Sequence, residues 1–171
     1  MATFARHVDV DWTGTLMEGN GTAKAGTGAF SVPVTFPSRI APEGDGKTTP
    51  EEFMAASHAV CYAMVLVNTI GKQGGKARRV RVTATVTGDK SDAGLKVVSS
   101  HLTAVVEGLE GIARGKIQEL ASGAVFAVSV RNTIISPGKS CLSGWNFSNA
   151  GTFPYIRLLL DGTSQFVQLA E

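Results

Sequence analysis

The order of apolar and polar positions along the chain predicts short strands first and a long helix after them. Residues 7–12 alternate with a period of two, which is typical of a strand with one buried face. Glycines at 19–21 and 26–28 punctuate two further short strands, the second over 30–36. Pro33 has no N–H to donate, so we expect that strand at a sheet edge or a bend. The three strands together predict a meander.

The strongest helix signal begins near residue 50, after a loop that we expect over 37–47. Thr48 or Thr49 can cap the helix, Pro50 suits its first position, and two glutamates follow where the helix dipole favours negative charge. Apolar residues then continue almost without a break until a glycine-rich stretch, 71–75, ends the helix. A helix that is apolar on nearly all sides is typically buried, so we expect this one at the centre of the fold.

Two strands and a second helix are predicted after the long helix. The strands cover 80–86 and 95–106 and are joined by a turn between Gly88 and Gly94. The helix covers 112 to about 130 and has one apolar face, formed by Ile117, Leu120, Ala121, Ala124 and Val125. The order of strands and helices predicts an α+β fold, with antiparallel β-sheets packed on long central helices.

The last part of the chain changes in character. Residues 137–140 break any strand, and 146–152 have the composition of a loop. Residues 158–160 and 166–167 could pair as short strands. We therefore predict one domain over residues 1–135 and a C-terminal extension over residues 136–171, which could be a subdomain, a docked tail or an appendage.

Composition and charge exclude several classes of protein. The 171 residues carry 16 basic and 14 acidic side chains, which is not the clustered basic excess of a nucleic-acid binder. The basic run 76–81 alternates with apolar residues and predicts a strand with one solvated face. The apolar segment 60–67 is far shorter than the roughly 20 residues that span a bilayer. No apolar stretch follows Met1, so we expect no signal peptide. We expect a cytoplasmic protein that binds neither nucleic acid nor membrane.

The chain contains two cysteines, Cys61 and Cys141. In a reducing compartment we expect neither of them to form a structural disulfide. On composition alone, a cysteine within an apolar helix is usually an inert core residue. The three histidines have no metal-ligand spacing, so we expect no metal site. His58 lies three residues before Cys61 and could hydrogen-bond near it, although such a histidine is more often a satisfied core or interface residue.

Residues 49–64, which read TPEEFMAASHAVCYAM, resemble the signature helix of the OsmC/Ohr family of organic hydroperoxide reductases. In that family a proline and a glutamate precede an alanine-rich turn, and the peroxidatic cysteine follows ten residues after the glutamate. Residues 38–40, Ser-Arg-Ile, resemble the loop arginine of the OsmC branch. The resemblance runs from about residue 5 to 135, and it implies an OsmC-like intertwined homodimer.

By that resemblance Cys61 is the peroxidatic thiol, Arg39 is its activating cation, and Glu51 holds Arg39. The implied activity is a thiol-dependent peroxidase of oxidative-stress defence, which needs no cofactor and reduces organic hydroperoxides to alcohols through a sulfenate. The chemistry is consistent, because the thiolate is the nucleophile and a nearby guanidinium favours the anion. The alternative for Glu51 is that it merely favours the helix start.

The length of the helix adds an expectation about the site. Ten helical residues rise about 15 Å, so Glu51 and Cys61 of one chain cannot share a site if the helix is continuous. We therefore expect Glu51, and with it Arg39, to come from a second chain. Two antiparallel helices in a twofold homodimer would place the sites at the subunit interface.

One departure from the family concerns recycling of the sulfenate. Family reductases carry a second cysteine in a Cys-Pro-Val-Ser context, and the matching residues 126–129 read Phe-Ala-Val-Ser. Cys141 could fold back to resolve Cys61, or an external dithiol reductant could do so. The alternative function is a catalytically impaired, redox-sensing or ligand-binding member of the family. Phe126 would add to an apolar lining, which suits an alkyl or lipid peroxide.

Overall fold

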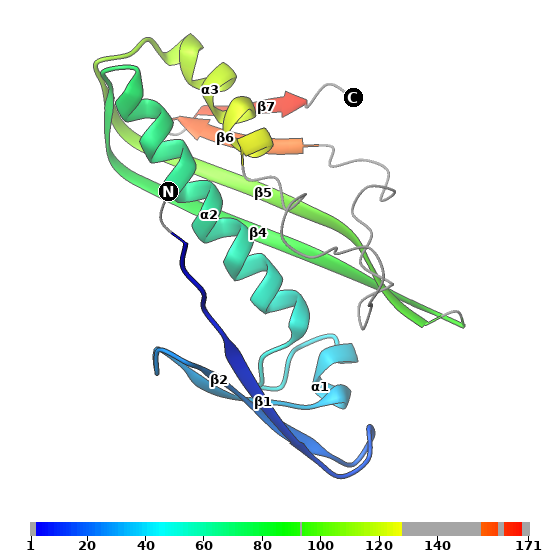
Figure 1. Cartoon of the computed structure of the whole chain (residues 1–171). Helices are drawn as coiled ribbons and strands as arrows, with labels where there is room; N and C mark the ends of the chain where they lie inside the picture. The colour runs from blue at the N-terminus through cyan, green and yellow to red at the C-terminus, as the bar shows by residue number, and fades with distance from the viewer. Residues whose placement is uncertain (1–2, 93, 128–154, 161–162, 169–171) are drawn as a thin grey trace. The chain divides into compact units, whose positions relative to one another are not determined.

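The computed structural model describes residues 3–92, 94–127, 155–160 and 163–168 (Figure 1). It divides the chain into two compact units, Met1–Phe53 and Met54–Glu171. The long helix α2, Pro50–Lys72, begins at the end of the first unit and continues into the second. Each unit is described by itself below.

The first unit contains a three-stranded antiparallel sheet of strands β1 (Val8–Thr13), β2 (Asn20–Ala25) and β3 (Ser31–Val34), in that order. The register pairs Val8 with Ala25 and Gly21 with Val34. The predicted meander is confirmed, and Pro33 lies on an edge strand, where a missing N–H is tolerated.

The glycines at 19–21 do not form the turn that their composition predicted, because Asn20 and Gly21 belong to β2. A Cβ on Gly21 would lie 2.8 Å from the carbonyl oxygen of Asp11 on the neighbouring strand. Glycine is therefore required here by the close approach of two strands. The turn between β1 and β2 uses Gly14, which follows the alternating residues 7–12 and whose φ of 86° suits glycine.

A short helix, α1 (Phe36–Ile40), replaces the first part of the loop predicted over 37–47. The Thr35 side chain caps it, since its Oγ1 accepts a hydrogen bond from the Ser38 backbone N–H at 3.3 Å. A proline in the first turn fits a helix start because its missing N–H has no partner there. The strand predicted over 30–36 is therefore too long, and β3 ends at Val34.

The second unit contains a four-stranded sheet in the order β4-β5-β6-β7. Strands β4 (Lys76–Ser91) and β5 (Gly94–Glu110) form a long antiparallel hairpin, with a register shift at Thr87/Gly88. The turn predicted between Gly88 and Gly94 is thus too wide, because Gly88 belongs to a strand and the chain reverses after Ser91. Arg78, Arg79 and Arg81 are exposed, which confirms the solvated face of the basic run.

The two short strands predicted near the C-terminus are confirmed as β6 (Tyr155–Leu160) and β7 (Thr163–Gln168), which pair antiparallel. Strand β6 also pairs with β5, and this pairing is parallel. The last part of the chain therefore continues the sheet of the preceding hairpin. The predicted boundary at residues 135/136 lies outside the described residues and stays a prediction.

The core of the second unit lies where α2 and helix α3 (Arg114–Ala127) pack against one face of the sheet (Figure 1). On the helices, buried side chains recur every three or four residues, and on β5 they alternate. The cluster consists of Tyr62, Leu66, Ile70, Leu102, Ala104, Val106, Ile117, Ala121 and Ala124. The apolar face predicted for the second helix is confirmed at Ile117, Leu120, Ala121 and Ala124, and the side chain of Val125 lies outside the described ones.

The expectation that α2 is buried on nearly all sides is wrong for the single chain. One face of the helix is in the core, whereas Val60, Met64 and Val67 on the other are 55%, 68% and 52% exposed. Among the described residues, α2 is also a helix long and apolar enough to cross a membrane by length and composition alone, which is weak evidence for a span. An apolar face without cover in its own chain needs another explanation.

Candidate active site

Arg39 is positioned by α1, in whose last turn it lies. The preceding residue, Ser38, is 4% exposed, and its hydroxyl lies 2.7 Å from the hydroxyl of Thr35. The capped, partly buried turn holds the backbone that carries the guanidinium. A helix of five residues has little stability of its own, so the cap at Thr35 matters for the position of Arg39.

Arg39 and Glu51 form a two-pronged ion pair within the first unit. The guanidinium Nη2 donates to Glu51 Oε1 at 2.7 Å, and Nε lies 3.1 and 3.3 Å from the two carboxylate oxygens. The two side chains are 22% and 15% exposed, so the pair is mostly withdrawn from water. Such geometry fixes the plane of the guanidinium, which a single contact would leave free to turn.

The neighbouring glutamate, Glu52, has a different task. Its backbone N–H donates to Thr49 Oγ1, and its carboxylate accepts from the Thr49 N–H, both at 3.2 Å. This reciprocal arrangement is a capping box, which satisfies the free N–H groups at the start of α2. Glu51 is also in the first turn of α2, but its carboxylate is bonded to Arg39, so it does more than favour the helix start.

Cys61 lies in the part of α2 that belongs to the second unit, and it is exposed. The alternative that it is an inert thiol sealed in the core is wrong for the single chain. On the helix surface it borders the exposed apolar stripe of Val60, Met64 and Val67. The arrangement of Cys61 with respect to Arg39 stays a prediction.

His58, one turn before Cys61, has a hydrogen-bond partner on the sheet. Its Nδ1 lies 2.7 Å from the hydroxyl of Ser100 on β5. Burial lowers the pKa of His58, since desolvation disfavours the charged ring. One ring nitrogen of this half-buried histidine, Nδ1, is therefore satisfied by the sheet.

Tyr62, which follows Cys61, ties α2 to α3. The side chain is fully buried, and its hydroxyl donates to the backbone carbonyl of Ala121 at 3.1 Å. Burial raises the pKa of Tyr62 because the phenolate would lose its hydration. The bond fixes the helix that carries Cys61 against the helix that carries Phe126.

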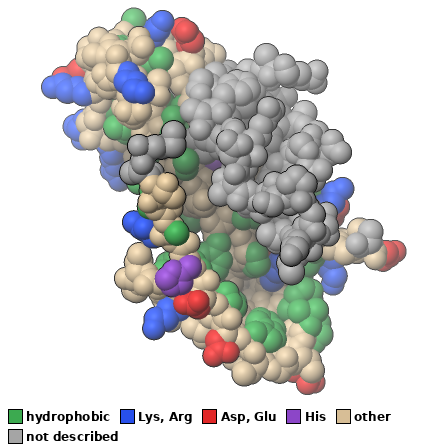
Figure 2. All heavy atoms as spheres, viewed as in Figure 1, with side chains coloured by type: hydrophobic (Ala, Val, Ile, Leu, Met, Phe, Trp, Pro, Cys, Tyr) green, Lys and Arg blue, Asp and Glu red, His purple; other side chains and the backbone are tan. Residues whose placement is uncertain are grey.

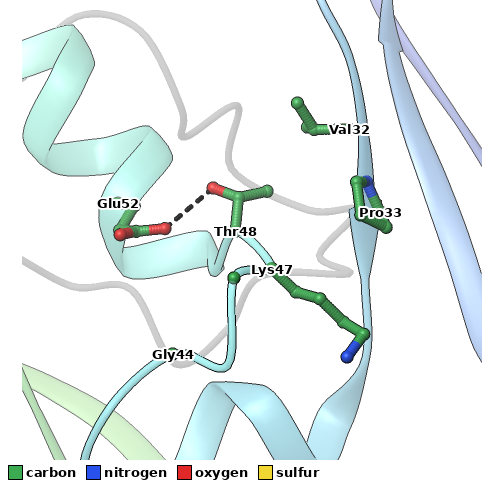
Figure 3. A pocket seen from close by; sticks show the side chains of 7 residues that line it. Val32, Pro33, Gly44, Lys47, Thr48 and Glu52 are labelled. Carbon is green, nitrogen blue, oxygen red and sulfur yellow. Dashed lines mark hydrogen bonds between the residues drawn. The ribbon is translucent and has the colours of Figure 1, made fainter.

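A shallow hollow of about 390 Å³ lies beside the start of α2, within the first unit (Figure 3). Its polar groups are already engaged with one another: Lys47 pairs with Asp45 at 3.0 Å, and Thr48 donates to Glu52 at 3.0 Å. The lining residues are Val32, Pro33, Gly44, Gly46, Lys47, Thr48 and Glu52. Sequence inspection did not indicate this hollow.

Two residues of the recycling hypothesis have little structural description. Phe126 lies on α3, and its side chain is outside the described ones. Cys141 lies outside the described residues, so its suggested resolving role stays a prediction. No group of three or more His, Cys, Asp and Glu side chains that could hold a metal is found in the described part of the chain.

Sequence inspection missed Ser100 and Thr35. Neither has a motif of its own, and each acts through a contact that depends on the fold. Only the pairing of Ser100 with His58 across 42 positions shows its role. Thr35 had a weak signal as a helix cap, because it lies two residues before a proline. The alternating pattern of 30–36 favoured a strand there and concealed that signal.

A family model described as "OsmC-like protein" matches residues 43–139. The chain is also similar to "Peroxiredoxin OsmC" from Escherichia coli (strain K12), with 34% identity over 96 residues. That match covers 56% of this chain and 66% of the relative, slightly less than two thirds of its length.

Solved structures show the same fold. One is an organic hydroperoxide resistance protein OsmC from Legionella pneumophila, with a TM-score of 0.59 and 17% identity over 94% of this chain and 97% of that one. Another is the organic hydroperoxide resistance protein OhrB of Bacillus subtilis, with a TM-score of 0.54 and 18% identity over 90% of this chain and 97% of that one. At such identities the likeness concerns the fold alone.

Proposed function

The chain belongs to the OsmC-like family, and from that premise we propose that it is a thiol-dependent peroxidase that reduces organic hydroperoxides in the cytoplasm. Cys61 is the nucleophile, Arg39 stabilises its thiolate, and Glu51 holds Arg39 in place. The proposal involves no metal and no cofactor. An external dithiol, or Cys141, returns the sulfenate to the thiol.

The observation that carries the proposal is the exposure of Cys61 on α2. A thiol sealed in apolar packing is inert, whereas an accessible one can meet a peroxide. The apolar residues beside it, Val60 and Met64, would favour an alkyl chain over hydrogen peroxide, because burying apolar surface is favourable.

The chemistry of Arg39 supports its role. A free cysteine is mostly protonated at neutral pH, and a guanidinium within about 4–6 Å favours the anion. The bidentate pair with Glu51 holds the guanidinium plane and leaves Nη1 without a contact to that carboxylate. A carboxylate engaged in this way repels a thiolate less than a free one would.

A second copy of the chain completes the site. Glu51 and Cys61 are ten residues apart on the continuous helix α2, a rise of about 15 Å. One chain therefore cannot bring both groups to one peroxide along this helix. A twofold homodimer supplies Arg39 and Glu51 from one protomer and Cys61 from its partner.

Exposed apolar surface in both units supports the homodimer. In the second unit it is the outer face of α2, and in the first it is the sheet face of β1 with its flanking residues. Figure 2 shows hydrophobic side chains at the surface in the region of this sheet. The exposed residues of the first unit are Phe4, Val8, Val10, Trp12, Leu16 and Met17. Surface of this kind commonly marks an interface.

The second candidate function is a redox-sensing or ligand-binding protein that does not turn over. Phe126 favours it, because the family's second cysteine is expected at that position. Without a resolving thiol, Cys61 would stop at the sulfenic acid, or would proceed to irreversible oxidation.

Peroxide consumption distinguishes the two functions. We expect purified protein with cumene hydroperoxide and dithiothreitol to consume many equivalents of peroxide per chain, and Cys61→Ser to consume none. Cys141→Ser removes the other thiol and distinguishes a resolving role of Cys141 from none. Consumption that ends at one equivalent leaves only the sensor, and turnover by Cys61→Ser overturns the site.

Complementation tests the two-chain site. Glu51→Ala and Cys61→Ser chains are each expected to be inactive, and mixed dimers formed by co-refolding should recover one intact site of the two. The measurement is peroxide turnover in dimers whose mixed composition is verified by mass spectrometry. No recovery in such dimers would contradict the shared site.

A further inference from the structure

We propose that His58 is a further catalytic residue, which takes the proton of the Cys61 thiol and returns it to the alkoxide that leaves when the peroxide bond breaks. The inference rests on the proposed function of Cys61. It assigns the proton transfer to the imidazole, because a guanidinium does not give up its proton in proteins and the Glu51 carboxylate is engaged by Arg39.

The helix places the two side chains next to each other. Three residues of α-helix turn by about 300° and rise about 4.5 Å, so His58 and Cys61 lie about 60° apart around the axis. Cβ atoms at this spacing are roughly 5–6 Å apart. His58 is half-buried and Cys61 is exposed, so the pair lies at the border between the core and the exposed stripe.

Ser100 orients the ring. Its hydroxyl lies 2.7 Å from Nδ1 of His58, which leaves Nε2 as the ring atom without a partner among the described residues. A serine hydroxyl can accept a hydrogen bond, and it then holds the proton on Nδ1 and leaves a lone pair on Nε2. This is the arrangement of a general base whose second nitrogen is fixed by an orienting group.

The surroundings keep the ring neutral. Burial lowers the pKa of His58, so the ring is neutral at neutral pH and its lone pair is not occupied by a proton. On β4 the residue opposite Ser100 is Val86, which has no charge. Strand alternation puts the side chain of His101 on the other face of the sheet. The titratable side chains nearest to His58 along α2 and β5 are Cys61, Tyr62, Lys96 and His101.

No hydrogen bond joins the ring to the Cys61 sulfur among the described contacts, so the proton moves through one water or through the bound peroxide itself. It passes from the thiol to Nε2, and the thiolate attacks the terminal oxygen of the hydroperoxide. The S–O bond forms as the O–O bond breaks, and its electron pair leaves on the alkoxide. The sulfur is oxidised by two electrons, and the peroxide is reduced. The imidazolium then protonates the alkoxide, which gives sulfenic acid, alcohol and a neutral ring.

The test separates proton transfer from access to the thiol. We would measure single-turnover sulfenate formation with cumene hydroperoxide at pH 7, and alkylation of Cys61 by iodoacetamide at pH 10. His58→Gln can keep a hydrogen bond to Ser100 but cannot carry a proton. We expect it to slow the peroxide step by about 100-fold, at the low end of general acid–base catalysis. Alkylation should keep the wild-type rate, because a high pH supplies the base that removes a thiol proton and no alkoxide leaves.

His101→Gln is the matched control, since it makes the same substitution on the adjacent residue of Ser100 and should change neither rate. Ser100→Ala should slow the peroxide step severalfold and leave alkylation unchanged, and it serves as the test if His58→Gln does not fold. The inference is overturned if wild type and His58→Gln form sulfenate at equal rates. It is also overturned if His58→Gln slows sulfenate formation and alkylation equally. In both cases the proposed peroxidase function stands. Wild-type protein that forms no sulfenate overturns the proposed function as well.

Discussion

The two faces of α2 are similarly apolar but lie in opposite surroundings. On one face Tyr62, Leu66 and Ile70 are at most 1% exposed and pack against the sheet and α3 of their own chain. On the other face Val60, Met64 and Val67 are each more than half exposed. The first face is explained by the fold of a single chain. The second is not explained by the packing of the described residues, and Cys61 lies at its border.

This contrast separates stability from function along one helix. The residues that hold α2 in place and those that border the thiol alternate within each turn. A substitution can therefore affect the core and leave the candidate site accessible, or affect the exposed stripe and leave the core intact. Variants of the buried face should change the free energy of unfolding, and variants of the exposed face should change self-association.

The largest effect is expected from Leu66→Ala. The side chain is fully buried in the cluster of α2, α3 and β5, and its truncation leaves a cavity. We expect the free energy of unfolding, measured by urea denaturation, to fall by about 3 kcal/mol. Asn68→Ala, at an exposed position of the same helix, is the control and should stay within about 0.5 kcal/mol. Similar losses in both would show that the faces are not distinct.

A smaller effect, on assembly, is expected from Met64→Lys. The side chain is 68% exposed in the single chain, and a charge there would be buried in the proposed homodimer. We expect self-association, measured by sedimentation equilibrium, to weaken by at least about tenfold, or roughly 1.4 kcal/mol. Gln73→Lys places the same charge just beyond the end of α2 and should leave association unchanged. Unaltered association of Met64→Lys would contradict a partner on this face.

The smallest effect is expected from Tyr62→Phe, which removes only the hydroxyl bonded to Ala121. The loss should be about 1 kcal/mol in urea denaturation at pH 7, the usual net contribution of such a bond. Burial raises the pKa of Tyr62, so the folded chain keeps the proton that the unfolded chain gives up above pH 10.0. This contribution to stability is full below pH 10.0 and is lost as the pH rises further. Tyr62→Phe should therefore be less sensitive to alkali than wild type, and an equal sensitivity would contradict the assignment.

Capping residues and the spacing of apolar positions predicted much of the fold, because the same residues make the local contacts that start and end the elements. Thr49, Pro50 and the two glutamates mark the start of α2, and the capping box shows why. The predicted strand ends were wrong where a glycine lies inside a strand and does not form a turn. Gly88 has the composition of a turn, yet it lies at a register shift inside the hairpin. Gly21 allows close strand approach instead of a turn.

The candidate site was predictable in its residues but not in its supports. Arg39 and Glu51 came from a resemblance, and the structure shows how they meet, through a capped helix that the strand pattern concealed. Ser100 could not be found, because nothing near it in sequence reveals that it faces His58. Contacts between distant segments depend on packing, which periodicity does not encode.

The parallel pairing of β5 with β6 ties the middle of the chain to its last part. During synthesis on the ribosome, β5 emerges some 45 residues before β6. Until β6 is made, the backbone N–H and C=O groups on that edge of β5 have no strand to pair with. A product truncated before Tyr155 would keep that edge and could recruit strands from other molecules. The C-terminal strands thus cover the edge of β5, and we expect a chain without them to be less soluble than the full chain.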